Sequence, residues 1–188
     1  MRKILLTAML VFAVHSAYAG SSRVKNILIV YGSYAGSTAE MADSMKAALE
    51  RAGHKAFVVP VSAQATDLSP YELVIIGGAV HGAKVHEKVL KFVAANRAAL
   101  EKKPLAVFAA CITITSAKAD KRKAAEAYPD QIAAGLPVIS RAVFAGKAPS
   151  SGWFANMMGK MILGITPGDY RDWKKIDAWA VTLPGLVQ

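Results

Sequence analysis

Hydroxyl groups and glycines follow an apolar run near the start of the chain, a spacing that suits phosphate binding. Residues 27–31 are continuously apolar, as in a strand that is buried on both faces of a parallel sheet. Ser33, Gly36, Ser37 and Thr38 come next, before a helix-forming segment. Loop N–H groups and the dipole of the following helix would attract an anion placed above the turn. The pattern therefore predicts a phosphate-binding loop over residues 33–38.

The spacing of this loop excludes two common nucleotide-binding motifs. Gly32 and Gly36 do not fit G-x-G-x-x-G, and the nucleotide triphosphatase loop would need a Lys where Ser37 stands. Hydroxyls and backbone amides, without a cation, suit a terminal phosphate that is held rather than transferred. Ser37 and Glu40 have the spacing of a capping box, which predicts that the helix starts at Ser37.

Alternating apolar runs and amphipathic segments predict an α/β fold with helices on both faces of a parallel sheet. Five strands are expected at residues 27–31, 56–61, 73–76, 105–110 and 138–145. Helices are expected at residues 38–52, 85–99 and 117–128, the last ended or restarted by Pro129, and at the C-terminus. Pro60 favours an edge position for the second strand, and right-handed crossovers then give the doubly wound order 2-1-3-4-5. Ligands bind such sheets at the carboxyl ends of the strands, where the chain reverses direction between strands 1 and 3. The loops that border this crevice follow strands 1, 3 and 4, at residues 32–37, 78–85 and 111–116.

The first loop resembles the signature of the flavodoxin family. That signature is carried here by Ile29, Val30, Tyr31, Gly32, Ser33, Tyr34, Ala35, Gly36, Ser37, Thr38 and Ala42, with Met45 at a position that is usually aliphatic. The resemblance implies a flavodoxin-like fold and FMN as the cofactor. It also implies that the phosphate of FMN is held by Ser33, Tyr34, Ala35, Gly36, Ser37 and Thr38.

The other two loops would then border the flavin ring. Their candidate cofactor-binding residues are Ala79, Val80, His81 and Gly82 after strand 3, and Cys111, Ile112 and Thr113 after strand 4. His81 could stack on the ring or be an ordinary exposed loop histidine, while Lys84 and His86 are expected to begin the next helix and face solvent. The loop after strand 4 lacks the acidic and aromatic residues that carrier flavodoxins usually place there. Cys111 is expected to pack as a small apolar residue.

The C-terminal third suggests one branch of the family. Residues 153–165 are apolar nearly all round, with Lys160 as their only charge, which predicts a helix packed inside the domain or a surface that meets a membrane or a lipophilic substrate. With residues 71–77 and the pairs Gly168-Asp169 and Asp172-Trp173, the layout is similar to menaquinone-dependent protoporphyrinogen dehydrogenases. The similarity implies an oxidoreductase that links a lipophilic reduced substrate to a quinone. The alternatives are an electron shuttle between redox protein partners and a non-catalytic binding protein.

The N-terminal segment and the charge bear on location and partners. Arg2 and Lys3, an apolar run over residues 4–14 and Ala17-x-Ala19 have the anatomy of a signal peptide. We expect a signal peptide or anchor at residues 1–22 and a single domain at 23–188, in an exported, periplasmic or membrane-associated protein. A cytoplasmic-side protein is the alternative. The formal net charge of +10 favours an anionic partner, but no motif supports nucleic acid and no spacing indicates a metal site. A response-regulator receiver is excluded, because Gly77-Gly78 stands where its Asp would end strand 3.

Overall fold

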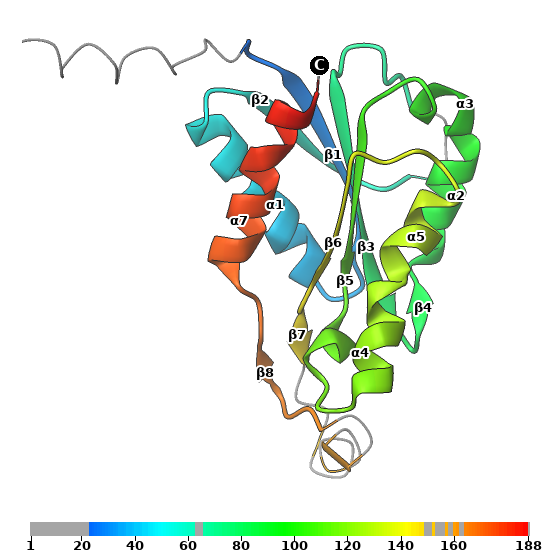
Figure 1. Ribbon diagram of the computed structural model, residues 1–188, viewed down its shortest axis with the longest axis vertical. Helices are drawn as coiled ribbons and strands as arrows, with labels where there is room; N and C mark the ends of the chain where they lie inside the picture. Colours follow the sequence, from blue (N-terminus) through cyan, green and yellow to red (C-terminus); the bar gives the residue numbers. More distant parts are fainter. Residues whose placement is uncertain are drawn as a thin grey trace, which may run out of the picture.

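Five parallel strands form the central sheet of the protein, as a computed structural model shows (Figure 1). The structure describes residues 23–62, 66–148, 152, 157, 160, 161 and 164–187. The segment predicted as a signal peptide lies outside these residues, as does most of the apolar segment at 153–165. Within the described part of the chain, no helix is long and apolar enough to span a membrane.

The strands and helices alternate along the chain as the sequence predicts. The strands are β1 Asn26–Gly32, β2 Lys55–Pro60, β3 Leu73–His81, β4 Lys84–Val85, β5 Leu105–Ala110, β6 Ser140–Phe144, β7 Lys147–Ala148 and β8 Gly168–Asp169. The α-helices are α1 Ser37–Arg51, α2 Glu87–Ala95, α3 Arg97–Leu100, α4 Ala119–Glu126, α5 Tyr128–Ala133 and α7 Trp173–Thr182. Two 3₁₀ helices are η1 Ile112–Thr115 and η2 Leu183–Leu186.

The order of the parallel strands is β2-β1-β3-β5-β6, which confirms the predicted order 2-1-3-4-5. β1 lies in the middle of the first three strands, with Ile27 opposite Ala56 of β2 and Leu73 of β3. Pro60 ends the edge strand β2, where its missing N–H costs no ladder hydrogen bond. The carboxyl ends of β1, β3 and β5 therefore lie at one end of the sheet (Figure 1).

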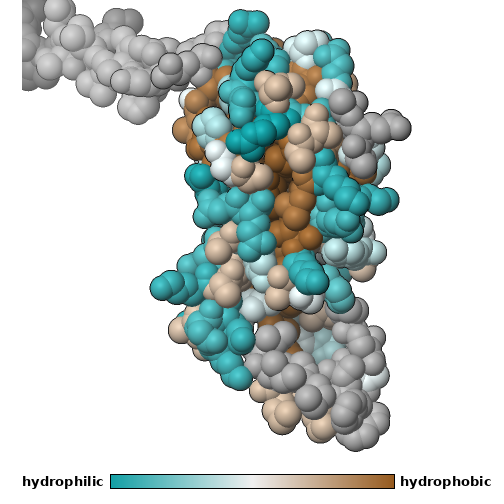
Figure 2. Space-filling model, turned by 90° about the vertical axis from the view of Figure 1, so that its right-hand side faces the viewer, coloured by the Kyte–Doolittle hydropathy of each residue, from teal (hydrophilic) through white to brown (hydrophobic). Residues whose placement is uncertain are grey.

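Two apolar cores fill the space between the sheet and its helices. Ile27 and Ile29 of β1 face the core under α1 and α7, while Leu28 and Val30 face the core under α2 to α5. Figure 1 shows α1 and α7 on one side of the sheet and the other helices on the opposite side. Figure 2 views that second side, where an apolar band runs between hydrophilic side chains. Successive side chains of β1 thus pack alternately into the two cores.

The end of β3 differs from the prediction. The sequence predicted a strand at residues 73–76 followed by a loop from Gly78, but β3 continues to His81 and turns back into β4. Gly82 and Ala83 form a two-residue turn with φ values of 54° and 60°, as a type I′ hairpin requires. Gly77 and Gly78 are needed for packing instead. A Cβ on Gly77 would lie 2.2 Å from the Phe108 ring.

Two of the predicted helices are each divided into two in the structure. The helix predicted at residues 85–99 is divided at Asn96, whose side-chain amide donates to Phe92 O at 2.9 Å and accepts from Thr66 N–H at 2.7 Å. The predicted restart at Pro129 is confirmed, since α4 ends at Glu126 and α5 carries Pro129 in its first turn. A proline is tolerated there because the first N–H groups of a helix have no intrahelical acceptor.

Candidate functional site

The turn between β1 and α1 presents unused backbone donors. Gly36 has a φ of 85° and precedes the first helical residue, and Glu40 N–H makes the first helical bond to Gly36 O at 3.0 Å. The N–H groups of Ser37, Thr38 and Ala39 have no helical acceptor, as in the first turn of any helix. Within the described part of the chain these three groups donate no hydrogen bond, and neither do the N–H groups of residues 34 and 35. Five N–H donors are therefore available in one short turn.

The hydroxyl groups of this loop are placed differently from one another. Ser33 Oγ accepts from Gly36 N–H at 3.0 Å and so braces the turn. Ser37 Oγ accepts from Lys147 N–H at 3.3 Å, which brings the start of β7 against the loop. Thr38 is 1% exposed, so its side chain is buried at the start of α1. These groups shape the turn, while the backbone N–H groups are its open donors.

The predicted capping box is wrong. The residue before the helix is Gly36, and no side chain caps the N-terminus of α1. In the described part of the chain Glu40 accepts no hydrogen bond from the turn, and its carboxylate is held by Arg171 and Lys147 instead. The helix still starts at Ser37, as the sequence predicted.

An aromatic cluster, which we define as Tyr34, His81 and His86, joins the first loop to the β3–β4 hairpin. Tyr34 is 57% exposed, and its ring centroid lies 4.4 Å from that of His86 and 5.7 Å from that of His81. The two loops that sequence analysis placed at the crevice therefore meet. Their meeting point has an exposed aromatic side chain on top.

His86 corrects a prediction, because it does not face solvent. The residue is half-buried before α2, and its N–H donates to Ala79 O at 2.9 Å. Its Nδ1 is buried and has no hydrogen-bond partner in the described part of the chain. A Cβ on Gly32 would lie 3.0 Å from this nitrogen, so Nδ1 faces the end of β1. Burial, with a smaller contribution from Lys88, lowers the pKa of His86 and keeps the imidazole neutral.

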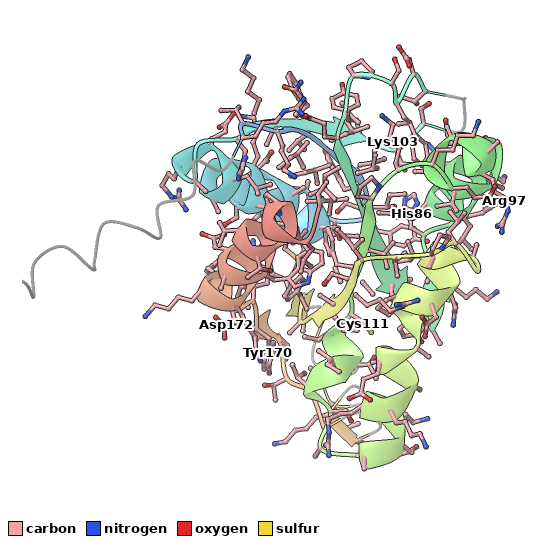
Figure 3. All side chains as sticks on the ribbon, turned by 45° about the horizontal axis from the view of Figure 1, so that its top comes forward. His86, Arg97, Lys103, Cys111, Tyr170 and Asp172 are labelled. Atoms are coloured by element: carbon pink, nitrogen blue, oxygen red, sulfur yellow. The ribbon has the colours of Figure 1, made fainter. Side chains whose placement is uncertain are left out.

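The remaining candidate residues lie in the hairpin and after β5. Ala79 is buried inside β3 opposite Ala110 of β5, whereas Val80 and His81 pair with β4. Cys111 is 1% exposed and donates its N–H to Phe144 O at 2.9 Å. Burial raises the pKa of the Cys111 thiol, which confirms its prediction as a packed apolar residue. Half-buried Ile112 and Thr113 open the 3₁₀ helix η1. Figure 3 shows Cys111 and His86 on the sheet side that carries α2 and α5.

An ionic cluster, which we define as Glu40, Lys147, Asp169 and Arg171, lies on the other side of the loop. Arg171 Nε and Nη2 donate to Asp169 at 2.8 and 2.6 Å, and Nη1 donates to Glu40 at 2.7 Å. Lys147 Nζ lies 3.1 Å from both oxygens of Glu40. The guanidinium, 2% exposed, also stacks on the Trp173 ring at 4.3 Å. The cluster fixes the β7–β8 pair to the first turn of α1.

The cluster keeps its carboxylates ionised. Arg171 lowers the pKa of Asp169 to about 2 by hydrogen bonding. Arg171 first, and then Lys147, also lowers the pKa of Glu40. Sequence reasoning did not predict this cluster: Glu40 was assigned to a capping box, Asp169 was noted in the Gly168-Asp169 pair, and Lys147 and Arg171 were not named. Asp172 has a local role, because it caps α7 by accepting from Lys175 N–H at 3.0 Å beside Tyr170 (Figure 3). In the described residues no group of His, Cys, Asp and Glu side chains could hold a metal ion.

Comparison with known proteins bears on both the sequence and the fold. The model of the flavodoxin domain family matches residues 28–171. No curated protein matches the chain. Oxidised flavodoxin 1 from Bacillus cereus is 19% identical, with a TM-score of 0.54 over 84% of this chain and 96% of that one. A short-chain flavodoxin associated with a bacterial microcompartment is 12% identical, with a TM-score of 0.58 over 88% and 100%. Rubredoxin oxygen:oxidoreductase from Desulfovibrio gigas is 13% identical, with a TM-score of 0.55 over 86% of this chain and 36% of that one.

Proposed function

Since this chain belongs to the flavodoxin domain family, we propose that it is a flavoprotein that binds FMN and transfers electrons. The observation that carries the proposal is the turn at residues 33–38, with five open N–H donors at the N-terminus of a 15-residue helix. Such a turn accepts a phosphate without a cation of its own.

The residues present fit FMN in chemistry as well as in position. The donor set in the first loop is neutral and rich in N–H groups, as a phosphate requires. Tyr34 and His81 offer aromatic surface at the rim, and η1 offers Ile112 and Thr113. We infer that residues 33–38 hold the phosphate and that the hairpin and η1 border the flavin ring. Riboflavin, which lacks the phosphate, should bind more weakly.

In this proposal the protein positions a cofactor that carries the electrons. Flavins, when bound, supply one- and two-electron chemistry, while the protein supplies orientation and electrostatics. The apolar residues around Cys111 exclude water from one side of the site. His86 stays neutral because of its burial, so it adds no fixed positive charge below Tyr34. The surroundings of the ring are thus mostly uncharged.

The electron partner that we propose first is another redox protein. Solved structures with this fold include carriers named flavodoxins and an oxidoreductase named for rubredoxin. The formal net charge of +10 supports a partner with an acidic surface. Export across a membrane, which the pattern of residues 1–22 favours, is part of the same proposal. It predicts a new N-terminus at Gly20, which intact-mass analysis of protein from the native host would test.

A second candidate is transfer to a quinone, as the resemblance to menaquinone-dependent protoporphyrinogen dehydrogenases implies. The observation that favours it is the exposure of Met157 and Met161, at 46% and 66%, beside exposed Lys160. Exposed methionines next to a cation suit a lipophilic molecule or an anionic membrane surface.

Two glycine variants test FMN binding. Gly36→Ala and Gly53→Ala both place Ala at a positive φ, of 85° and 88°, at opposite ends of α1. We expect unfolding free energies that fall by a similar amount, about 1 kcal/mol. Only Gly36→Ala should weaken FMN binding, measured by quenching of flavin fluorescence. If the unaltered protein quenches no FMN fluorescence, the proposed function is wrong.

A surface variant tests the second candidate. Met157→Ser with Met161→Ser should slow quinone reduction and weaken binding to anionic vesicles, with FMN affinity unchanged. Val181→Ser with Leu186→Ser is the matched control, since these side chains are 40% and 51% exposed elsewhere on the surface. Equal behaviour of the two double variants would leave the redox protein as the partner.

A further inference from the structure

The ionic cluster brings a half-exposed cation, Lys147, to the turn at residues 33–38, which has no cation in its own sequence. Lys147 is 110 residues from Ser37 in the chain, yet its N–H donates to Ser37 Oγ at 3.3 Å. Gly146 also lies against the loop, because a Cβ there would be 3.5 Å from the same oxygen. The backbone before β7 thus delivers the Lys147 side chain to the edge of the turn.

The ammonium group of Lys147 neutralises the Glu40 carboxylate, which would otherwise repel a phosphate. Glu40 Oε1 would lie 3.9 Å from a Cβ on Gly36, so this carboxylate stands next to the open donors. A phosphate above those donors would be repelled by Glu40 unless a cation compensates. Lys147 Nζ, 3.1 Å from both Glu40 oxygens, is placed to do so.

The two cations of the cluster differ in how firmly they are held. Arg171 is 2% exposed and donates to both Asp169 and Glu40, so it is fixed. The Lys147 side chain is 42% exposed, and among the described residues its ammonium group contacts one carboxylate, that of Glu40. Its long side chain can therefore turn between Glu40 and an anion in the loop, whereas Arg171 cannot.

We propose that Lys147 is a specificity-determining residue of the cofactor site, which selects a phosphorylated flavin by sharing its charge between Glu40 and the phosphate. The inference rests on the proposed function, since it takes residues 33–38 as the phosphate site. It assigns Glu40 the opposite effect: this carboxylate weakens phosphate binding and restrains Lys147. The four charges of the cluster sum to zero. Removing a cation therefore leaves a net negative charge beside the loop, and removing a carboxylate leaves a net positive charge there.

The test compares FMN with riboflavin in charge-removing variants. Lys147→Met keeps the backbone bond to Ser37 and should raise the Kd for FMN about two- to fivefold, as expected for a half-exposed ionic contact. The Kd for riboflavin should stay unchanged, and raising the salt concentration should weaken FMN binding less than in the unaltered protein. Lys46→Met is the matched control, because Lys46 is 38% exposed and pairs with Glu50 on α1 at 2.6 Å.

Removing the carboxylate instead of the cation should change the Kd for FMN in the opposite direction. Glu40→Gln should lower the Kd for FMN, and the double variant Glu40→Gln with Lys147→Met should return it toward the original value. An unchanged Kd for FMN in Lys147→Met would overturn the inference, and so would an equal loss of riboflavin. In both cases the unaltered protein still binds FMN and the proposed function stands. If the unaltered protein binds neither flavin, the proposed function fails and the inference falls with it.

Discussion

The two clusters beside the phosphate loop use opposite kinds of interaction. The ionic cluster holds the loop from the α1 and α7 side through short hydrogen bonds between charges, around a guanidinium that is 2% exposed. The aromatic cluster meets the loop from the α2 side through ring contacts, under a Tyr34 that is 57% exposed. One side fixes the backbone of the loop, and the other covers a surface that a flat molecule could occupy. The proposed site at residues 33–38 thus has a fixed side and an exposed side.

The largest effect is expected on the ionic side, from Arg171→Met. The change leaves Asp169 and Glu40 without their shared partner and removes the stacking on Trp173. We expect the unfolding free energy to fall by about 2–4 kcal/mol, less than for a fully buried pair because the carboxylates can regain water. Urea unfolding measures this. Arg51→Met, which removes an exposed pair with Asp177, should stay within about 0.5 kcal/mol. Equal losses in both variants would contradict a fixing role for the cluster.

The next largest effect is expected beside the aromatic cluster, from a substitution of Gly32. A Cβ at Gly32 would lie 2.5 Å from Val89 Cγ2 and 3.0 Å from the His86 ring. Gly32→Ala should therefore lower the unfolding free energy by about 1–3 kcal/mol through overpacking. Gly185→Ala, where a Cβ meets nothing within 4 Å, is the control for urea unfolding. A Gly32 variant as stable as that control would show that His86 moves away freely.

The two clusters should titrate in different pH ranges. Burial lowers the pKa of His86 and also that of His54, which follows α1, is 8% exposed and lies outside both clusters. Both pKa values lie below 6.5, so the unfolded chain binds more protons than the folded one in mildly acidic solution. Their contribution to stability is complete above about pH 6.5 and is lost as the pH falls through the folded values. Asp169, with its pKa lowered from 3.8 to about 2, contributes fully above about pH 4 and loses this contribution toward pH 2.

Urea unfolding from pH 7 to about pH 2 separates these ranges. Changing both histidines to Gln should remove the upper part of the decline, and Asp169→Asn should remove only the lower part. A decline that the histidine variants leave intact would show that the upper range belongs to other groups.

The smallest effect is expected from Tyr34→Ala. Its side chain is more than half exposed, so the unfolding free energy should change by no more than about 0.5 kcal/mol. The pKa of His86 should rise toward its ordinary value because the ring that covers the imidazole is gone. An NMR titration of the imidazole signals measures this, with His54 as the internal reference. An unchanged His86 would mean that Val89 and Gly32, rather than Tyr34, bury it.

Local features of the site were predictable from the sequence, and distant pairings were not. The strand before Ser33, the turn at Gly36 and the helix from Ser37 depend on neighbouring residues, and all three are found as predicted. The prediction of a capping box failed because Glu40 has cationic partners more than 100 residues away. Charged side chains such as Lys147 and Arg171 follow no periodic pattern that would reveal such a partner.

The hairpin shows a second reason for a missed feature. Gly77 and Gly78 were interpreted as the start of a loop, since glycine commonly ends a strand. Here they continue β3, because the Phe108 ring and Ile132 occupy the space that larger side chains would need. A glycine that makes room for a ring on a neighbouring strand cannot be told from a turn glycine by sequence alone.

The pairing of β7 with β8 has a consequence for how this fold can vary. Ala148 lies opposite Gly168, so the two ends of the connection between these strands lie side by side. The closure entropy of a loop between such points grows only slowly with its length. A change in the length of this connection would therefore cost little closure entropy and need not alter the sheet or the turn at residues 33–38. β7 and β8 thus form a fixed attachment point at which this fold could carry different recognition segments beside the proposed cofactor site.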